Sequence, residues 1–406
     1  MDVDVAVVGG GQAGLAVSHE LSALDVEHVV LERGRVGQTW RDRWETFCLV
    51  TPNWSVQLPG RHYDGTDPHG FMPRDDIVAY LERYAAGFEA PVREGVDVSA
   101  IDGAPGREGF VLRTSDGDVR ARDVVMATGA YQRPHRPPGS ETLPPDLPQL
   151  DVEDYRSERE LPDGRVLIVG SGQSGCQIAE ELHESGRDVV LACGKAPWAP
   201  RRIGAHDLIW WALETGFMDA RVEDLPDPAA RLVGNILSSG HGGGHDLHYR
   251  TLEADGVTLA GHFLGAEGHE AQFAPDLAES VSWGDARLAD LMKLAGRVAE
   301  ERGLEPPDVP EPEPFQARGD VRLDLRDVGC VMFATGFRPD YSSWLGWLEA
   351  FDELGFPIHA DGTSTSVPGL HFAGVHFLRK RKSSLLLGVG EDASILARSI
   401  AGAVPK

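Results

Sequence analysis

The stretch that decides the fold covers residues 1–32 and reads MDVDVAVVGGGQAGLAVSHELSALDVEHVVLE. Apolar patterning predicts a strand over Val3–Val8, then a helix, then a second strand over Glu27–Leu31. The turn between the first strand and the helix matches G-x-G-x-x-G at Gly9, Gly11 and Gly14. This order of strand, glycine turn, helix and strand predicts a doubly wound, dinucleotide-binding unit.

Each glycine of this turn has a physical reason. Gly9 permits the tight turn, Gly11 lets the backbone approach a pyrophosphate, and Gly14 lets the helix pack closely on the strand. The helix N-terminus then offers free N–H groups and the positive end of the helix dipole to the phosphates. Glu32 follows directly after the second predicted strand, where a carboxylate can accept hydrogen bonds from a ribose diol.

The opening unit recurs later in the chain as an internal repeat. Residues 165–193 repeat it at an offset of 161, and Gly170, Gly172 and Gly175 form a second G-x-G-x-x-G. Gln173 of the repeat matches Gln12 of the opening unit. Two such units in one chain predict two bound dinucleotides.

The two units differ at the position of the acid. Cys193 holds the place in the second unit that Glu32 holds in the first, so the second unit lacks the carboxylate that would repel a 2′-phosphate. Lys195, Arg201 and Arg202 follow closely, and a cationic cluster suits a 2′-phosphate. We therefore expect FAD at the first unit and NADPH at the second, with a solvated basic turn as the alternative for the three cations.

Small residues at strand ends predict further close approaches to a ligand. Ala127-Thr128-Gly129 ends an apolar strand, and Ala334-Thr335-Gly336 repeats this pattern. A plain strand-to-turn ending is the alternative at each place. The segment after Glu32 contains Gly37-Gln38-Thr39-Trp40, which suits a loop around a bound flavin. The predicted nucleotide-contacting residues also include Ala13, Arg33, Val98, Ser174 and Gly374.

Composition limits the classes of partner. The formal net charge of −26 argues against nucleic acid or an anionic membrane surface. No apolar run approaches the roughly 18 residues of a membrane helix, and the chain starts without a signal-peptide pattern. Four scattered cysteines without C-x-x-C predict no disulfide framework and favour a reducing, cytoplasmic setting.

The domain organisation follows from the repeat and from a proline-rich segment over residues 132–148. We expect an α/β fold with two doubly wound, Rossmann-like domains, in which the NADPH domain is inserted into the FAD domain. The expected ranges are 1–150 for the first part of the FAD domain, 151–326 for the NADPH domain, and 327–406 for the second part of the FAD domain. A helix is predicted over Ile203–Phe217.

Two other segments carry candidate sites. Residues 238–249 are rich in glycine and histidine, but zinc-ligand spacing is not met, so a flexible loop is favoured over a metal site. Arg379-Lys380-Arg381-Lys382 is a basic run in an acidic protein. It is equally compatible with a solvated turn and with a clamp for phosphate or an anionic substrate.

These motifs together resemble the flavin-containing, class B monooxygenases, including the plant indole-pyruvate monooxygenases. The resemblance covers nearly the whole chain and rests on both glycine units, the tryptophan loop and the two Ala-Thr-Gly strand ends. It implies FAD and NADPH held by one chain, flavin reduction by NADPH, and reaction with O2 to a flavin C4a-(hydro)peroxide. It further implies that one oxygen atom is inserted into a small organic substrate by N-, S- or ketone oxidation, in a protein that could form a homodimer.

The chain departs from this family at one pattern. The family's F-x-G-x-x-x-H is not met, because Pro145, Leu147 and Asp151 stand at the matching places. The alternative function is therefore an NADPH-dependent flavin oxidoreductase or oxidase without oxygen insertion. Asn53 lies near the position of the family's active-site asparagine. It is either a catalytic residue that donates a hydrogen bond to the oxygenated flavin or a cap of the turn after Pro52.

Overall fold

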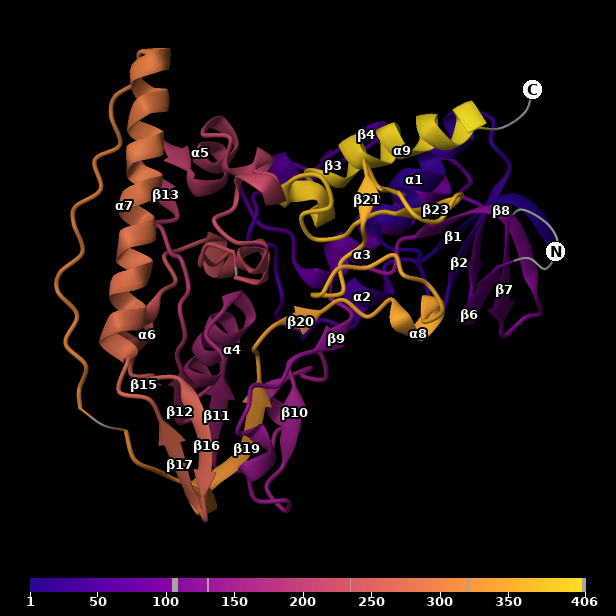
Figure 1. Cartoon of the computed structure of the whole chain (residues 1–406). Coiled ribbons are helices and arrows are strands. Elements are labelled where there is room, and N and C mark those ends of the chain that lie inside the picture. Colours follow the sequence, from indigo (N-terminus) through magenta and orange to yellow (C-terminus); the bar gives the residue numbers. More distant parts are fainter. Residues whose placement is uncertain (104–108, 130, 234, 320, 404–406) are drawn as a thin grey trace.

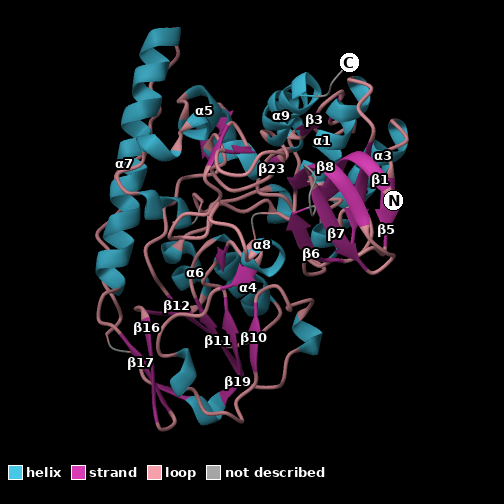
Figure 2. Ribbon diagram, turned by 45° about the vertical axis from the view of Figure 1, so that its right-hand side comes forward, coloured by secondary structure: helices cyan, strands magenta, loops and turns pink. Residues whose placement is uncertain are grey.

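A computed structural model describes residues 1–103, 109–129, 131–233, 235–319 and 321–403. The described chain forms two units, the first built on a mixed sheet with parallel central strands and the second on a parallel sheet (Figure 1). Figure 2 shows the two sheets as separate blocks of strands, with loops and short helices between them. Among the described residues, no helix combines the length and apolar composition needed to cross a bilayer.

The first sheet is centred on the strand that opens the chain. β1 (Asp2–Val8) lies between β2 (His28–Glu32) and β8 (Val119–Met126), and all three run parallel. The sheet also contains β5 (Val92–Glu94), β6 (Val98–Gly103), β7 (Phe110–Thr114), β21 (His359–Ala360), β22 (Thr363–Ser364) and β23 (Leu370–Phe372). Residues 92–103 form two strands, β5 and β6, because the chain turns at Gly95, which has a positive φ.

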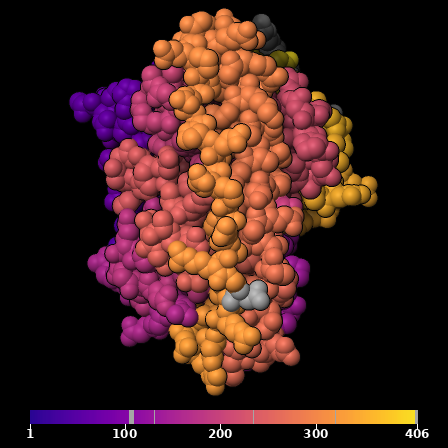
Figure 3. Space-filling view, turned by 90° about the vertical axis from the view of Figure 1, so that its left-hand side faces the viewer, coloured from indigo at the N-terminus to yellow at the C-terminus, as the bar shows by residue number. Residues whose placement is uncertain are grey.

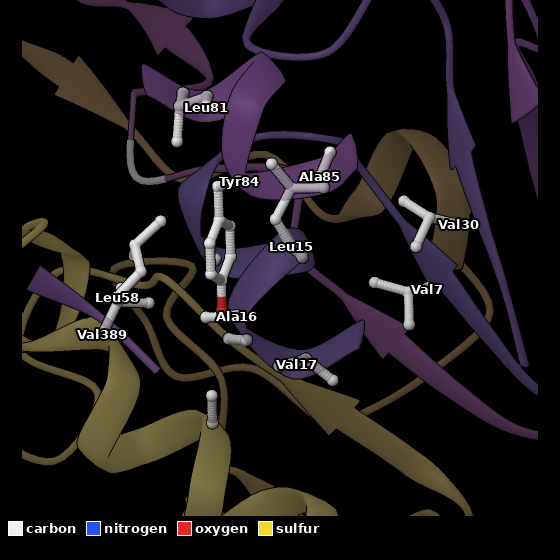
Figure 4. Close-up of a cluster of buried hydrophobic side chains, with 14 of the residues drawn as sticks. Val7, Leu15, Ala16, Val17, Val30, Leu58, Leu81, Tyr84, Ala85 and Val389 are labelled. Carbon is white, nitrogen blue, oxygen red and sulfur yellow. The ribbon is translucent and has the colours of Figure 1, made fainter. Parts of the chain in front are cut away.

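Alternation along β1 divides its side chains between two cores. Val5 and Val7 point to a core with helices α1 (Gln12–Ala23), α3 (Arg74–Gly87) and α9 (Val389–Ala403), whereas Ala6 and Val8 point to the opposite face. Figure 4 shows Leu15 and Tyr84 in the first of these cores, between the sheet and Val389 of the closing helix. The last helix of the chain therefore completes the unit that the first strand begins.

The second sheet has the strand order β10-β19-β11-β12-β15, and all its neighbours are parallel. Alternate side chains of its central strand again serve two cores: Val166 and Ile168 face helix α4, and Leu167 and Val169 face the β16–β17 hairpin. The bounds are β10 (Gln149–Asp151), β11 (Arg165–Val169), β12 (Val189–Ala192), β15 (Thr258–Ala260), β16 (Phe263–Glu267), β17 (Glu270–Phe273), β19 (Val328–Phe333), α4 (Gln173–Glu184) and α6 (Tyr249–Asp255).

The second unit carries the longest helix of the described chain, α7 (Leu277–Arg302). Residues 303–319 then run back along this helix as an extended strap, which covers its outer face in Figure 3. Arg250 of α6 holds the strap by donating to the Glu313 carbonyl at 2.8 Å, and its guanidinium lies 5.8 Å from the ring of Phe315. This proline-rich segment therefore lies on the surface of the second unit.

Two crossing strands connect the units. β9 (Arg133–Pro134) leaves the first unit and pairs antiparallel with β20 (Phe337–Arg338), which returns to it. The predicted boundary at residue 327 is wrong, because β19 belongs to the second sheet and the chain leaves that sheet only after Phe333. Similarly, the predicted boundary at residue 150 falls inside β10, a strand of the second sheet.

The helix predicted over Ile203–Phe217 is shorter in the structure. A two-stranded hairpin, β13 (Arg202–Ile203) and β14 (His206–Asp207), precedes α5 (Leu208–Glu214). Asp207 caps this helix by accepting the N–H of Ile209 at 2.8 Å, and Gly204 makes the hairpin turn at positive φ. A cap and a turn glycine inside the apolar pattern thus delay the start of the helix to Leu208.

A buried carboxylate, that of Asp123, lies where β8 meets β23 in the first unit. Nε2 of His371 lies 3.2 Å from Oδ1 of Asp123, and Arg122 donates through Nε to Oδ2 at 2.7 Å. Burial would raise the pKa of Asp123, but the hydrogen bonds from His371 and Arg122 outweigh it and hold this pKa below its ordinary value. The ionised carboxylate therefore stabilises the fold.

We expect Asp123→Asn to lower the free energy of unfolding by about 1–3 kcal/mol at pH 7, as measured by urea denaturation. A carboxyl group with a depressed pKa stabilises fully above its unfolded-state pKa of about 3.9 and loses this effect as the pH falls through the folded-state value. The difference between variant and wild type should therefore shrink below about pH 4. Asp4→Asn, which removes the exposed partner of Arg122 at 3.5 Å, is the matched control and should stay within about 0.5 kcal/mol.

Candidate functional site

The first glycine turn is shaped by contacts that exclude side chains at two of its three glycines. A Cβ at Gly9 would lie 2.4 Å from the Ala127 carbonyl oxygen, and a Cβ at Gly14 would lie 1.9 Å from the Gly9 carbonyl oxygen. Gly11 is different, because a Cβ there would meet no described atom within 4 Å. Its backbone has φ −82° and ψ −172°, a conformation that any residue can adopt. The space beside Gly11 therefore fits a ligand that approaches the backbone, as a pyrophosphate does.

Glu32 faces this turn from the end of β2. Its Oε2 accepts the N–H of Gly10 at 2.7 Å, and its Oε1 accepts the N–H of Gly34 at 2.8 Å. The residue is 7% exposed, and the two bonds fix its carboxylate beside the turn. Each carboxylate oxygen has further acceptor capacity, so the group can also accept hydroxyl donors from a ribose.

Gln12, at the start of α1, joins two distant loops to the turn. Its Oε1 accepts the indole N–H of Trp40 at 2.9 Å, and its Nε2 donates to the carbonyl of Ser384 at 3.1 Å. Gly374 comes equally close, since a Cβ there would lie 2.5 Å from Cβ of Ala13. The predicted tryptophan loop and the residues before α9 are thus brought to the phosphate-binding end of α1.

The strand end at residues 127–129 lies against the same turn. Ala127 donates its N–H to the carbonyl of Val8 at 2.9 Å, and Thr128 accepts the side-chain amide of Gln132 at 2.6 Å. Gly129 has φ +91°, and nothing lies within 4 Å of where its Cβ would be. These residues continue the open surface that begins at Gly11.

The remaining residues predicted for the first site are more dispersed. Arg33 and Thr39 are exposed, and Gln38, in α2 (Gln38–Arg41), donates to Asp42 at 2.9 Å. Val98 begins β6, and its carbonyl accepts the indole N–H of Trp344 at 2.8 Å. These hydrogen bonds lead away from the glycine turn, so the contacts of Gln38 and Val98 with a nucleotide stay predictions.

The second glycine turn repeats the geometry of the first. A Cβ at Gly170 would lie 2.6 Å from the Ala334 carbonyl oxygen, and one at Gly175 would lie 2.0 Å from the Gly170 carbonyl oxygen. Gly172 is again open, with nothing within 4 Å. Gly336 has φ +81° and is open as well. Thr335 is held by donating its hydroxyl to the carbonyl of His135, and Ser174 lies half-buried in the first turn of α4.

The hydrogen bond that joins the glycine turn to the end of the neighbouring strand runs in the opposite direction in the second unit. In the first unit the turn donates to Glu32, whereas in the second unit the turn accepts from Gly194. Ser171 takes the place of Gly10, and its hydroxyl oxygen accepts the N–H of Gly194 at 2.9 Å. The same hydroxyl lies 2.6 Å from the hydroxyl of Tyr249, which donates to the Gly194 carbonyl. Cys193 is fully buried, and its thiol points to the Leu191 carbonyl at 3.4 Å. The acid of the first unit is thus replaced by a neutral hydroxyl network.

The three cations predicted beside this turn do not form one cluster. Arg201 is 4% exposed and uses its guanidinium inside the protein, donating to Asp207, to the Val50 carbonyl at 2.7 Å and to Ser238 at 2.9 Å. The prediction of a three-cation cluster is therefore wrong for Arg201, whose partners come from distant parts of the chain. Lys195 is half exposed, 3.6 Å from Glu279, and Arg202 is exposed and bonded to the Ala205 carbonyl.

Sequence reasoning missed His262, which follows β15 closely. Its Nε2 would lie 3.0 Å from a Cβ at Gly194, so the ring stands over the end of β12. Asp276 orients the ring through Nδ1 at 2.6 Å. The adjacency of β12 and β15 in the sheet creates this contact, and a lone histidine so far along the chain from Cys193 gives no local signal of it.

Asn53, in the 3₁₀ turn Asn53–Ser55, is buried and holds a loop of the backbone. Its side-chain amide donates to the Asp67 carbonyl at 2.9 Å, and its side-chain oxygen accepts the N–H of Met72 at 2.8 Å. Both polar ends of the side chain are therefore engaged by residues 67–72. This geometry favours the structural alternative over the catalytic one.

Thiol and metal chemistry receive no support from the described residues. All four cysteines are free and buried, and burial raises the pKa of Cys48 and of Cys330 to about 11 each. Of the histidines in residues 238–249, His245 pairs with Glu180 at 2.7 Å and His248 caps α6. No group of three or more potential metal ligands occurs in the part of the chain that the structure describes.

A small cleft lies where residues 44–48 face α4. Its walls include Glu180, Glu181 and Glu184 of that helix, together with His241. These carboxylates would repel the phosphates of a dinucleotide. We therefore assign this cleft no part in nucleotide binding.

Comparison with known proteins agrees with the two-nucleotide geometry. Residues 6–208 match the family model described as pyridine nucleotide-disulphide oxidoreductase. An uncharacterised CzcO-like oxidoreductase of Geobacillus kaustophilus is 31% identical over 405 residues, covering 98% of each chain. Rice indole-3-pyruvate monooxygenase YUCCA1 is 33% identical over 187 residues, covering 44% of this chain and 45% of the relative. A flavin-containing monooxygenase of Stenotrophomonas maltophilia has the same fold, with a TM-score of 0.69, 20% identity, and coverage of 99% and 98%.

The second turn yields a matched pair of variants. Gly175→Ala places a methyl group 2.0 Å from the Gly170 carbonyl and should destabilise the protein by about 1–3 kcal/mol. Gly172→Ala meets no protein atom within 4 Å and should change stability by no more than about 0.5 kcal/mol. It should nevertheless weaken NADPH binding about tenfold or more in isothermal titration calorimetry, since its methyl group occupies the space for the phosphates. Full NADPH affinity in Gly172→Ala would show that the phosphates bind elsewhere.

Proposed function

The chain belongs to the pyridine nucleotide-disulphide oxidoreductase family, and on that premise we propose that it is an FAD- and NADPH-dependent monooxygenase. In this reaction, NADPH, a proton, O2 and a small organic substrate give NADP+, water and a substrate that carries one added oxygen atom. The observation that carries the proposal is a pair of glycine turns with the same geometry but different residues beside them. The first turn has an acid, Glu32, at the end of the neighbouring strand, and the second has the uncharged Cys193 at the matching position. The proposed partners are the substrate and O2, and the buried free thiols support a reducing, cytoplasmic setting.

The first turn fits FAD. A ribose of FAD with both hydroxyls free can donate to the carboxylate of Glu32, and the open space at Gly11 suits the pyrophosphate. Trp40 and Ser384, joined through Gln12, would then lie toward the ring end of the flavin. The bound flavin supplies the electron transfer and the reaction with O2.

The second turn fits NADPH. The position of the acid is occupied by a buried neutral thiol, so no carboxylate of β12 repels a 2′-phosphate. Lys195 and the ring of His262 lie at the ends of adjacent strands, where the 2′-phosphate of a dinucleotide binds. We assign the recognition of this phosphate to Lys195, Arg202 and His262.

The role of the rest of the chain is to position the substrate and exclude water. An apolar cluster lies where α5 of the second unit meets the loop before α9, and it contains Ile209, Ala212, Met218 and Leu387. Trp54, next to Asn53, packs on its edge. Because these four side chains are buried, they exclude water from this part of the junction, and the exclusion of water limits the competing release of peroxide.

The second candidate is an NADPH-dependent flavin oxidoreductase or oxidase that does not insert oxygen. The unmet F-x-G-x-x-x-H pattern over residues 145–151 favours it. A disulfide-reducing version is disfavoured, because all four thiols are buried and burial raises the pKa of each of them.

Oxygen labelling separates the two candidates. The flavin-loaded enzyme is supplied with NADPH and ¹⁸O2 and screened against amines, thioethers and ketones, while NADPH consumption and hydrogen peroxide are counted separately. We expect at least one substrate to gain a single ¹⁸O atom, with peroxide well below the NADPH consumed. Peroxide equal to the NADPH consumed with every substrate would establish the oxidase instead.

Nucleotide selectivity tests the assignment of NADPH to the second turn. Replacement of Lys195 and Arg202 by Gln, alone and with His262→Ala, should raise the KM for NADPH about tenfold or more, because each charged hydrogen bond contributes roughly 1.5–3 kcal/mol. The KM for NADH should change less than about twofold, since NADH lacks the 2′-phosphate. Lys293→Gln, on the exposed side of α7, is the control cation. Equal losses for both nucleotides would contradict the assignment.

A further inference from the structure

The basic run at residues 379–382 is the least expected feature of an acidic chain, and three of its four cations are neutralised inside the protein. Arg379 pairs with Asp361 at 2.9 Å and with Asp392 at 3.0 Å. Lys380 lies 2.7 Å from Glu391, and Lys382 lies 3.0 Å from Asp219. For these three residues the structure supports neither a phosphate clamp nor a freely solvated turn.

Arg381 is the exception within this run. No carboxylate among the described residues lies within 4.0 Å of its guanidinium, and its buried Nε has no hydrogen-bond partner there. The guanidinium lies between two aromatic rings, 4.1 Å from that of Phe217 and 4.7 Å from that of Phe377. Burial lowers the pKa of Arg381 to about 10, so the group is charged at neutral pH.

The guanidinium of Arg381 is partly buried, and a buried N–H donor such as its Nε is costly to leave without an acceptor unless a ligand supplies one. The ring contacts offset only part of this cost, because rings do not satisfy N–H donors as an oxygen does. Two neighbours add to the deficit: Nδ1 of His376 and Nε of Arg231 are also buried without partners among the described residues. Burial, and then the charge of Arg381, lower the pKa of His376 to about 4, so His376 is neutral at pH 7 and adds no second positive charge.

The position of Arg381 places this cation at the junction of the two units. It begins the 3₁₀ turn η9 (Arg381–Ser384), whose last carbonyl accepts the side chain of Gln12. Its backbone N–H donates to the Ala220 carbonyl, beside η4 (Phe217–Asp219) of the second unit. Figure 1 shows the loop before α9 next to α5.

The apolar cluster defined above borders the cation directly. Phe217 packs against the cluster and also holds the guanidinium, and Leu385 and Leu387 follow η9 in sequence. Ser384 lies in the same turn, and its hydroxyl is buried without a partner in the described chain. An apolar wall with one unpaired cation and one free hydroxyl at its edge is complementary to an apolar molecule that ends in an anion.

We propose that Arg381 anchors a carboxylate of the substrate, so that the enzyme acts on small apolar carboxylic acids. This assignment rests on the proposed function. A planar guanidinium binds a carboxylate with two parallel hydrogen bonds, which would satisfy its free donors and orient the apolar part of the acid along the cluster. The aromatic pair keeps the guanidinium in place before the acid arrives, so little side-chain entropy is lost on binding.

The test compares 3-phenylpropionate with 3-phenylpropionamide, which have the same shape and differ in charge. Binding to the flavin-loaded enzyme is measured by isothermal titration calorimetry at pH 7. We expect wild type to bind the acid at least tenfold more tightly than the amide. Arg381→Gln should remove this preference by weakening the acid alone, and Arg381→Lys should retain part of it. Lys382→Gln, in the same run but internally paired, should keep the wild-type ratio.

Several results would overturn the assignment. Equal affinity of wild type for acid and amide, or no binding of either, would show that no carboxylate site exists. A preference that persists in Arg381→Gln would place the site elsewhere. An equal loss of NADPH affinity in Arg381→Gln would identify a nucleotide phosphate as the anion. Flavin content and melting temperature establish that each variant is folded, and Arg381→Lys carries the comparison if the Gln variant is not. Because binding needs no turnover, these outcomes are independent of whether labelled oxygen reaches a product.

Discussion

The structure depends on two close backbone approaches, in which a strand-end carbonyl occupies the place of a glycine side chain. The Ala127 carbonyl does this at Gly9, and the Ala334 carbonyl does it at Gly170. Each contact presses a glycine turn against the neighbouring strand end, and the last glycine of the turn lets the helix follow at once. What remains open at Gly11 and Gly172 is then a surface of backbone alone, which is what a phosphate group requires.

The two glycine turns belong to different units, and these units meet at one junction. The tryptophan loop, the turn at residues 381–384 and the hairpin before α5 all meet there, joined by the side chains of Gln12, Arg201 and Lys380. Arg201 and Lys380 each bind a residue of one unit to a residue of the other. The chemistry proposed for this junction therefore needs both units in their correct relative position, whereas each proposed nucleotide site is formed by one unit alone.

Local features were largely predictable from the sequence, and distant contacts were not. Spacing alone located both glycine turns, their flanking strands and helices, and the acid at Glu32, because the features of each unit lie within about 30 residues of each other. Arg201 could not be read in this way, since its partners Val50 and Ser238 come from both units. The same holds for His262, which reaches Gly194 only through the pairing of β12 with β15, and for the membership of β19 in the second sheet. The sequence also could not show that Arg381 differs from its neighbours in the basic run. Asp219, which pairs with the neighbours Lys380 and Lys382, lies far from them in the sequence.

The strand order also bears on how the polypeptide is made. The five described strands of the second sheet lie between Gln149 and Phe333, so that sheet can form before β23 and α9 are synthesised. The first sheet receives β23 only at residue 370, and its core is closed only by the last helix. During translation the inserted unit can consequently assemble while its host is still unfinished, which inverts the usual order in which N-terminal segments fold first. The pairing of β9 with β20 then joins the two parts of the host unit where the chain leaves it and returns to it.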